Sequence, residues 1–518
     1  MSIISLQFFI FLIAVNLIYW ICPSRFRWII LLFASYFFIW YAISDQPYLI
    51  IVFTAETLLV WGSALLLKRE ISEKTKSLLV ACNVTVLLLL LAAYKDAFFF
   101  TNNFNKLSRL FSWGKTLNAP NWAAPLGISY YSLILIGYLL DVRWGTVEEP
   151  QRNPLRLLLF AGYFPQMTSG PFSRYNDIST ALFGEVKWSL KQTEYGLQRM
   201  LWGLFKKLVL AERLAVMTAT LYDSQTAPLT ENIYVGTAVI IGAFLYALQL
   251  YTDFSGCIDI VIGASELFGI PLAENFRQPF FSTSVSEIWR RWHMTLGFWL
   301  KDYLLYPTLK SKWMAGFRAF CKKRFGKKAA KDLPTYLGML ILWFCIGFWH
   351  GGTWKYIFGS GIVFFLIIVG GMVLKPTAMK VISFLRIDTD AWSWKFFQRC
   401  RSFCLFSFGV SFQRRDSLIS GFRAWKTVFT GWNPWLLFND TFLKLGLNRK
   451  NVDICILGLV VVLIVSMLQE KHGSVRKLIS EQNLVFRWCI YLSLLFSVLI
   501  LGRYGPGYDP SAFIYGGF

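Results

Sequence analysis

Long apolar runs alternate with short polar segments along most of this chain. Eleven runs are long enough to cross, or nearly cross, a bilayer, which takes about 20 apolar residues per helix. They lie at residues 3–22, 27–44, 48–67, 78–100, 125–140, 155–169, 231–250, 335–349, 354–374, 453–468 and 486–502. The pattern therefore predicts an all-α integral membrane protein, a polytopic bundle of roughly eleven transmembrane helices.

Two further helical stretches, residues 190–222 and 283–306, are too charged to face lipid. We expect them to lie in the membrane interface or among other helices. The first run lacks a basic start and a small-residue cleavage site, which favours a retained span over a signal peptide. Because no soluble domain or repeat interrupts the pattern, we expect one membrane domain over residues 1–504, followed by a tail at 505–518.

Composition supports the membrane class. Of 518 residues, 56% are hydrophobic and 16% are charged, and the mean hydropathy is +0.49. Disordered, collagen-like and disulfide-scaffold classes are excluded by these values. The nine cysteines form no CxxC pair, so we expect buried free thiols and neither a disulfide frame nor a zinc site.

The net charge of +23 is concentrated in part in two segments. Residues 310–331 carry nine basic side chains and no acidic one, and residues 68–76 form a weaker basic segment. Cytoplasmic loops of membrane proteins are enriched in Lys and Arg, and anionic headgroups attract them. We therefore expect both to be cytoplasmic loops that contact membrane lipids, and we expect no nucleic-acid partner.

Only three histidines occur, and two of them stand out. His472 follows a span, and we interpret it as a solvated loop residue. His350 ends an apolar run and precedes Gly351 and Gly352, so an imidazole lies near membrane depth beside backbone that a ligand can approach closely. The alternative is a histidine that only caps the helix end.

His293 belongs to a polar cluster within a mostly apolar region. On a continuous helix, Glu287 reaches Arg290 and Arg291, and Trp289 and Arg290 share a face with His293. Such a cluster must line a cavity or a protein interior. A purely structural ion-pair network is the alternative interpretation.

The chemistry that these residues favour is acid–base catalysis by imidazole, whose pKa lies near neutrality. Two histidines 57 residues apart, without an HExxH motif, give little support to a metal site. No GxSxG, P-loop or dinucleotide fingerprint is present, so hydrolase, kinase and dehydrogenase classes lack a motif.

Several motifs resemble the membrane-bound O-acyltransferase family, in the bacterial branch of alginate O-acetyltransferases and teichoic acid D-alanyl transferases. The motifs are 251–256 (YTDFSG), 274–280 (ENFRQPF), 289–293 (WRRWH) with 302–303 (DY), and 349–351 (WHG). Weaker ones are 125–129 (PLGIS), 164–166 (FPQ), 169–171 (SGP) and 408–412 (FGVSF).

The resemblance implies a central tunnel between a cytoplasmic donor site and an acceptor site on the opposite face. It implies that His350 is catalytic, with His293 as the second family histidine. Besides Glu287, we expect seven further tunnel-lining residues: Trp289, Arg290, Arg291, Trp349, Gly351 and, as weaker candidates, Asp253 with Asn275.

The expected reaction is the transfer of an acyl group to hydroxyls of a cell-surface glycan, and we expect this acyl group to be acetyl. The donor is expected to be acetyl-CoA or an acyl-carrier-protein thioester, with no permanently bound cofactor. The location is the bacterial cytoplasmic (inner) membrane, with an extracytoplasmic transferase as partner.

The tail ends in F-x-Y-x-x-F, which looks like the end of the small single-span partner of the D-alanyl transferases. The resemblance implies that Tyr515 carries the acyl group in transit. The alternative is an aromatic tail anchored at the interface.

Two other functions are compatible with the pattern. One is D-alanyl transfer to teichoic acid from a carrier protein. The other is a proton-coupled transporter or flippase, which would use charged groups in or near spans, such as Glu56, Asp141, Asp253 and Glu266.

Overall fold

The structure is a computed structural model that describes residues 1–120, 122–223, 235–438 and 445–504. Within these ranges the secondary structure is helical, apart from one isolated antiparallel bridge between Phe276 and Trp292. The predicted all-α class is therefore confirmed.

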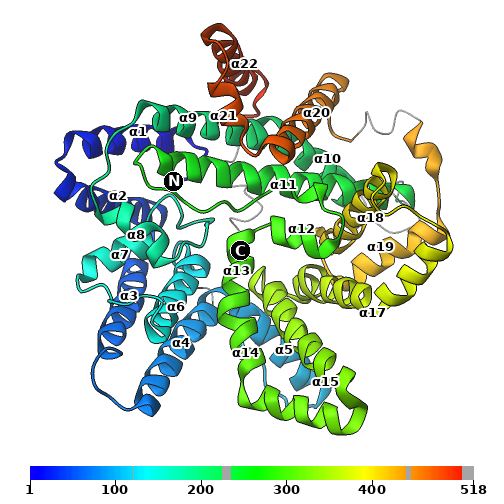
Figure 1. Cartoon of the computed structure of the whole chain (residues 1–518), viewed down its shortest axis with the longest axis horizontal. Coiled ribbons are helices and arrows are strands. Elements are labelled where there is room, and N and C mark those ends of the chain that lie inside the picture. The colour runs from blue at the N-terminus through cyan, green and yellow to red at the C-terminus, as the bar shows by residue number, and fades with distance from the viewer. Residues whose placement is uncertain (121, 224–234, 439–444, 505–518) are drawn as a thin grey trace. The chain divides into compact units, whose positions relative to one another are not determined.

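The chain forms two compact units (Figure 1). The first contains Met1–Leu204 and Cys257–Glu274, and the second contains Phe205–Gly256 and Asn275–Gly505. The division of the chain into a domain at 1–504 and a tail stays a prediction.

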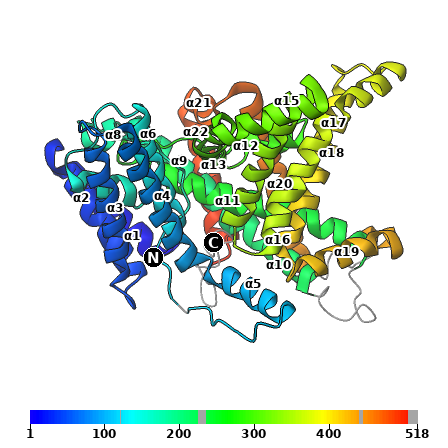
Figure 2. The same cartoon turned by 90° about the horizontal axis from the view of Figure 1, so that it is seen from below.

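The first unit is built around a buried helix. Its helices are α1 Leu6–Ile21, η1 Ser24–Phe26, α2 Arg27–Ala42, α3 Leu49–Leu66, α4 Glu73–Lys95, α5 Ala97–Leu110, α6 Ile128–Trp144, α7 Pro154–Gly162, α8 Tyr175–Phe183 and α9 Leu190–Leu204. Helix α6 is buried along nearly its whole length and packs against α3, α4 and α7. Figure 2 shows α3, α4 and α6 side by side.

The second unit carries both candidate histidines. Its helices are η2 Phe205–Ala211, α10 Glu212–Asp223, most of α11 Thr237–Glu266, η4 Pro279–Phe281, α12 Val285–Arg291, α13 Met294–Leu300, η5 Lys301–Leu305, α14 Tyr306–Lys310, α15 Lys312–Trp349, α16 Trp354–Tyr356, η6 Ile357–Ile362, α17 Val363–Phe384, α18 Trp392–Ser411, η7 Phe412–Arg414, α19 Leu418–Thr430, η8 Pro434–Leu437, α20 Arg449–His472, α21 Val475–Ser480 and α22 Leu484–Leu501. Three of these, η2, η5 and η6, are π-helical turns, a rare conformation that is frequent at functional sites.

Among the described residues, eight helices are long and apolar enough to cross a membrane, so the predicted count of eleven is not confirmed. The three predicted spans that fall short are 3–22, 125–140 and 155–169. Helix α1 has 16 residues and α6 has 17. Helix α7 has only nine residues, which is about 14 Å of helix. Its residues 157–162 are instead buried inside the first unit.

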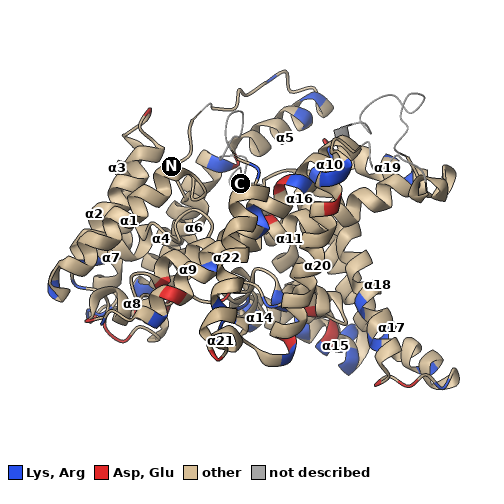
Figure 3. Ribbon diagram, turned by 90° about the horizontal axis from the view of Figure 1, so that it is seen from above, with Lys and Arg blue, Asp and Glu red and all other residues tan. Residues whose placement is uncertain are grey.

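The predicted basic loop at 310–331 is wrong in its secondary structure. Most of it forms the first half of α15, which starts after the N-cap Ser311. Lys, Arg and Ala are good helix formers, and exposed cations do not oppose a helix in contact with water. The helix is broken at Gly326, whose φ of 85° and ψ of −178° are non-helical. Figure 3 shows the Lys and Arg residues along α15.

Candidate functional site: two buried histidines of the second unit

His293 lies at a break between two short helices. Helix α12 begins after the N-cap Ser284, whose side chain accepts from the Glu287 amide, and it ends at Arg291. Trp292 is extended, and His293 has a left-handed backbone with φ 47° and ψ 49° before α13 starts. The continuous helix expected over 286–293 is therefore wrong, and so is the shared face of Trp289 and Arg290 with His293.

A short backbone ladder explains this break. The amide of Arg277 donates to the carbonyl of Arg291 at 2.9 Å, and the amide of Met294 donates to the carbonyl of Asn275 at 3.0 Å. These bonds flank the bridge between Phe276 and Trp292. Pairing with a segment that is distant in sequence overrides the helical tendency, because the ladder satisfies the same backbone groups.

The Asn275 side chain contacts the His293 ring in this arrangement. Its Oδ1 accepts from the Thr295 amide at 3.1 Å and from Thr295 Oγ1 at 2.9 Å. The same atom lies 3.3 Å from His293 Nδ1. Asn275 is fully buried. Asn275 thus lies against the His293 ring, and its expected place in the wall of a tunnel stays a prediction.

The Trp349 ring packs near both histidine rings. Its ring centroid is 6.0 Å from that of His293 and 5.0 Å from that of His350. Phe254 packs edge-on against His293 at 4.9 Å. His293 is 3% exposed and His350 5%. The tertiary structure therefore brings together two histidines that are 57 residues apart in the sequence.

The environment keeps His293 neutral. Burial lowers the pKa of His293 well below its usual value, and the positive charge that His350 can carry lowers it further. Both causes disfavour the imidazolium, since a charge loses hydration when buried and is repelled by a like charge. A neutral imidazole is the form that can accept a proton.

His350 is the C-terminal cap of α15, and its backbone amide donates to the Ile346 carbonyl at 3.1 Å. The backbone at Gly351 is less open to a ligand than expected. A Cβ built there would lie 2.5 Å from the Tyr356 ring, so this aromatic side chain occupies the space beside the glycine.

The charged neighbours of the cluster are partly engaged elsewhere. Arg291 pairs with Glu287 and Glu470, each at 2.8 Å. Glu287 also accepts from the Thr283 amide at 2.9 Å. Arg290 is exposed. For Arg291 and Glu287 this is the structural ion-pair network that the alternative interpretation expects.

Trp289 belongs to an aromatic cluster and does not contact His293 in the way that was expected. Its ring packs against Trp343 at 5.2 Å and Phe364 at 4.9 Å. Its Nε1 is buried and has no hydrogen-bond partner among the described residues.

Asp253 lies in a buried ion cluster that the sequence reasoning missed in part. Lys207 Nζ lies 2.6 Å from Asp253 Oδ1 and 2.7 Å from Glu212 Oε1. The adjacent Lys206 donates to Ser255 Oγ at 2.8 Å. Two consecutive lysines within an apolar stretch were the available signal, because buried ammonium groups need partners.

A comparable cluster lies within the first unit. The buried Arg199 contacts Asp259 at 3.0 Å, Glu266 at 3.7 Å and Glu274 at 2.5 Å. Glu56 is also buried in this unit and accepts from Ser132 at 3.0 Å. Each of these partners is far away in the sequence: Arg199 is 60 residues from Asp259 and 75 from Glu274, and Ser132 is 76 from Glu56, so the pairs were not predictable.

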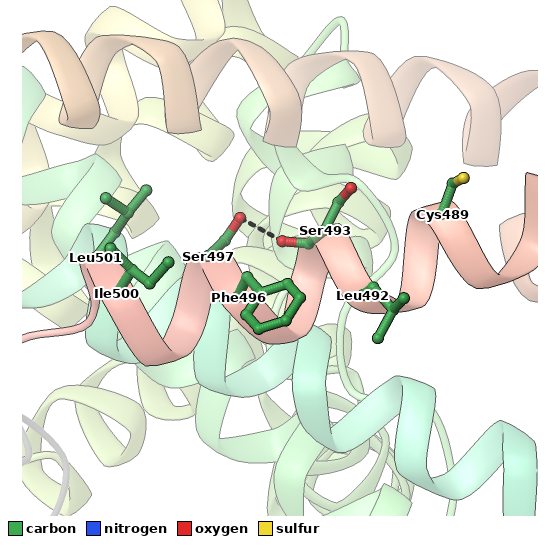
Figure 4. Close-up of a pocket in the computed structure, with 7 residues that line it drawn as sticks. All are labelled: Cys489, Leu492, Ser493, Phe496, Ser497, Ile500 and Leu501. Carbon is green, nitrogen blue, oxygen red and sulfur yellow. Dashed lines mark hydrogen bonds between the residues drawn. The ribbon is translucent and has the colours of Figure 1, made fainter.

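Two features remain, a pocket on α22 and the predicted acyl carrier. A pocket of about 580 Å³ runs along one face of α22, where Cys489, Ser493 and Ser497 line it together with apolar side chains (Figure 4). Ser497 Oγ donates within the helix to the Ser493 carbonyl at 2.6 Å. Tyr515, the predicted acyl carrier, lies outside the described residues.

The nine cysteines are all free, as expected, but only three of them are buried. Cys82, Cys400, Cys404 and Cys489 are exposed on the protein surface. The expectation that the thiols are buried is therefore wrong for these four cysteines.

Comparison with known proteins gives one family match and several relatives. Residues 144–321 match the model of the membrane-bound O-acyltransferase family, a range that includes His293. The chain is 29% identical over 342 residues to "Probable alginate O-acetylase AlgI" of Azotobacter vinelandii, which covers 66% of this chain and 62% of that protein.

Two other relatives carry different names. Peptidoglycan O-acetyltransferase of Helicobacter pylori is 28% identical over 52% of this chain and 50% of its own length. Teichoic acid D-alanyltransferase of Bacillus subtilis is 29% identical over 45% of this chain and 55% of its own length. The chain thus spans less than two thirds of the length of these curated relatives. Family match, relatives and helical membrane architecture agree, and residues 144–321 of the chain belong to the membrane-bound O-acyltransferase family.

Proposed function

We propose that this protein is a membrane O-acyltransferase that moves an acyl group, acetyl in particular, from a thioester donor to hydroxyls of a cell-surface glycan. The observation that carries the proposal is the pair of buried histidines whose rings both pack near Trp349. The names of the alginate and peptidoglycan relatives support acetyl as the group and a glycan as the acceptor.

The chemistry needs one base that later acts as an acid. The imidazole of His350 takes the proton of the acceptor hydroxyl while that oxygen forms a bond to the thioester carbonyl carbon. The tetrahedral intermediate collapses when the carbon–sulfur bond breaks. The imidazolium returns the proton to the departing thiolate, so the products are an ester and a free thiol. His293 orients the reacting groups.

The donor enters from the cytoplasmic side of the bacterial inner membrane, and the acceptor lies on the opposite side. Acetyl-CoA is the donor that we propose, with an acyl-carrier-protein thioester as the other thioester source. An extracytoplasmic transferase completes delivery to the glycan. The many basic side chains of α15 would attract a phosphate-bearing donor and anionic headgroups alike.

Tyr515 is proposed as a relay on the acceptor side. A phenyl ester is more reactive than a sugar ester, so an acyl group held on tyrosine can still pass downhill to a glycan hydroxyl. The Tyr515→Phe variant keeps the ring and removes the oxygen. We expect it to release acetyl to water at the wild-type rate and to leave the glycan unmodified. Normal glycan acetylation by this variant would exclude the relay.

The transporter alternative is less well supported. The transporter hypothesis uses four acidic residues in or near spans as its functional groups. Two of them have ionic partners that balance their charge: Asp253 pairs with Lys207, and Glu266 pairs with Arg199. D-alanyl transfer uses the same acyl chemistry and differs in the donor. Parallel assays with acetyl-CoA and with D-alanyl carrier protein separate these two reactions.

The decisive experiment compares two histidine variants of the purified protein in lipid. We expect His350→Ala to lose transfer from labelled acetyl-CoA by about 10²- to 10⁴-fold, the usual effect of removing a general base. His472→Ala is the matched control, because this histidine is exposed at the end of α20. Wild-type turnover by His350→Ala would contradict the proposed function.

A further inference from the structure

We propose that Asn275 is a positioning residue that holds His293 in a single tautomer, with the proton on Nδ1 and the lone pair on Nε2. The effect of this tautomer on catalysis rests on the proposed function, whereas the tautomer does not. The tautomer itself follows from the contacts of three buried residues.

The Asn275 side-chain atom that faces Thr295 is its carbonyl oxygen. The Thr295 amide can only donate a hydrogen bond, and it lies 3.1 Å from the Asn275 atom in question. That atom must therefore be the carbonyl oxygen Oδ1, and the flipped amide is excluded. Thr295 Oγ1 donates to the same oxygen at 2.9 Å.

The His293 tautomer follows from that assignment. Nδ1 of His293 lies 3.3 Å from the same oxygen, which can only accept. An unprotonated Nδ1 would bring two lone pairs together, so Nδ1 carries the proton. Because burial lowers the pKa of His293 well below its usual value, the ring has one proton, and Nε2 is left with the lone pair.

The backbone prevents the two side chains from drifting apart. The Met294 amide is bonded to the Asn275 carbonyl, and the neighbouring residues Phe276 and Trp292 form the antiparallel bridge. His293 is one of few residues other than glycine with a positive φ, a conformation that persists only where the surroundings impose it. The ladder thus fixes both the ring and its partner.

This tautomer limits what His293 can do in acyl transfer. Nε2 can accept a hydrogen bond or a proton, but it cannot donate one to the oxyanion that forms at the acyl carbonyl. His293 therefore acts on the side of the attacking hydroxyl or of the His350 ring, and donors to the oxyanion must be other groups. In metal sites, removing the hydrogen-bond partner of a histidine changes activity by about 10- to 100-fold, and we expect an effect of the same order here.

The first test needs no substrate. The full-length protein, labelled with nitrogen-15 in its three histidines and held in lipid bilayers, is measured by solid-state NMR near neutral pH. Variants of His350 and His472 assign the signals. We expect His293 to be neutral and protonated at Nδ1. A protonated Nε2, or a mixture of tautomers in the wild type, would overturn the proposal.

Three variants test the role of Asn275 in the same spectra. Asn275→Asp keeps an oxygen acceptor and should keep the Nδ1–H form, whereas Asn275→Ala should lose the single tautomer. Thr295→Val is the matched control, since it removes another donor to the same oxygen and leaves the contact with His293. If Asn275→Ala is unfolded, Asn275→Asp still decides, because loss of Nδ1–H there contradicts the proposal.

The catalytic consequence is measured separately. We expect Asn275→Ala to lower kcat about 10- to 100-fold with little change in KM, and Asn275→Asp to recover part of the loss. Full activity in an Asn275→Ala protein that has lost the tautomer would refute the catalytic role. Turnover by His350→Ala would instead refute the proposed function, so the two failures are distinguishable.

Discussion

Lys207 is an ammonium group that is almost fully enclosed by protein, with one carboxylate on each side. Such a group is stable only because Asp253 and Glu212 replace the water that it lost, at 2.6 Å and 2.7 Å. Removing the cation would leave two buried carboxylates without compensation. A buried ion pair is therefore costly to break even where it adds little to stability when intact.

We expect Lys207→Met to destabilise the protein by about 3 to 5 kcal/mol, the range for breaking a buried ion pair. Lys477→Met is the control, because Lys477 pairs with Glu481 at 4.0 Å on the exposed surface and should change stability by at most about 0.5 kcal/mol. Thermal unfolding in detergent compares the two. Equal unfolding temperatures would show that the Lys207 cluster is solvated.

The lowered pKa of His293 predicts a dependence of stability on pH. The unfolded chain takes up the proton near the ordinary histidine pKa of about 6.5, while the folded chain resists it to lower pH. The stability that this neutral ring contributes is complete above about pH 6.5 and is lost as the pH falls toward the folded pKa. His293→Gln should reduce the drop in unfolding temperature between about pH 7.5 and about pH 5.5. An unchanged drop would assign the pH dependence to other groups.

At the scale of elements, the position of His350 depends on how closely α15 approaches η6. A Cβ at Gly347 would lie 2.7 Å from the Ile357 Cα, and one at Gly361 would collide with the Trp343 carbonyl. Small residues allow helices in membranes to pack backbone against backbone. The end of α15 that carries His350 is therefore set by two glycines that have no chemistry of their own.

Gly361→Ala should push α15 away from η6, with a packing cost of about 1 to 3 kcal/mol and a large loss of acyl transfer. Gly370→Ala is the matched control in the same segment, since nothing lies within 4 Å of a Cβ built there. It should be neutral or stabilise the helix by up to about 1 kcal/mol. Transfer assays and unfolding temperatures of both variants test this. Equal activity would mean that the glycine contact does not position the histidine.

For the whole molecule, the distribution of charged residues predicts the orientation in the membrane. The basic segments at 68–76 and in α15 are both rich in Lys and Arg, and such segments stay on the cytoplasmic side. Cys321 cannot report on this, because it is buried in α15. Reporters must be placed at exposed positions of the two segments.

We expect cysteines introduced by Lys327→Cys and Arg69→Cys to be protected from a membrane-impermeant thiol reagent in intact cells and to react after permeabilisation. Both positions are exposed. The background variant lacks the naturally exposed cysteines, namely Cys82, Cys400, Cys404 and Cys489. Ready labelling of intact cells at both positions would reverse the orientation, and with it the side on which the donor enters.

The sequence by itself determined the helical membrane class and the two histidines, because apolar run length and the rarity of ionisable groups in such runs are local properties. It also carried the family motifs. The tertiary structure decided which apolar runs are buried inside a unit, as with α7, since length and packing partners are not visible in hydropathy. It also decided that the chain breaks at His293, that Asn275 holds its ring, and that Lys207 meets Asp253. Each depends on hydrogen bonds or charges that meet only in the folded chain, and local periodicity carries no information about such pairs.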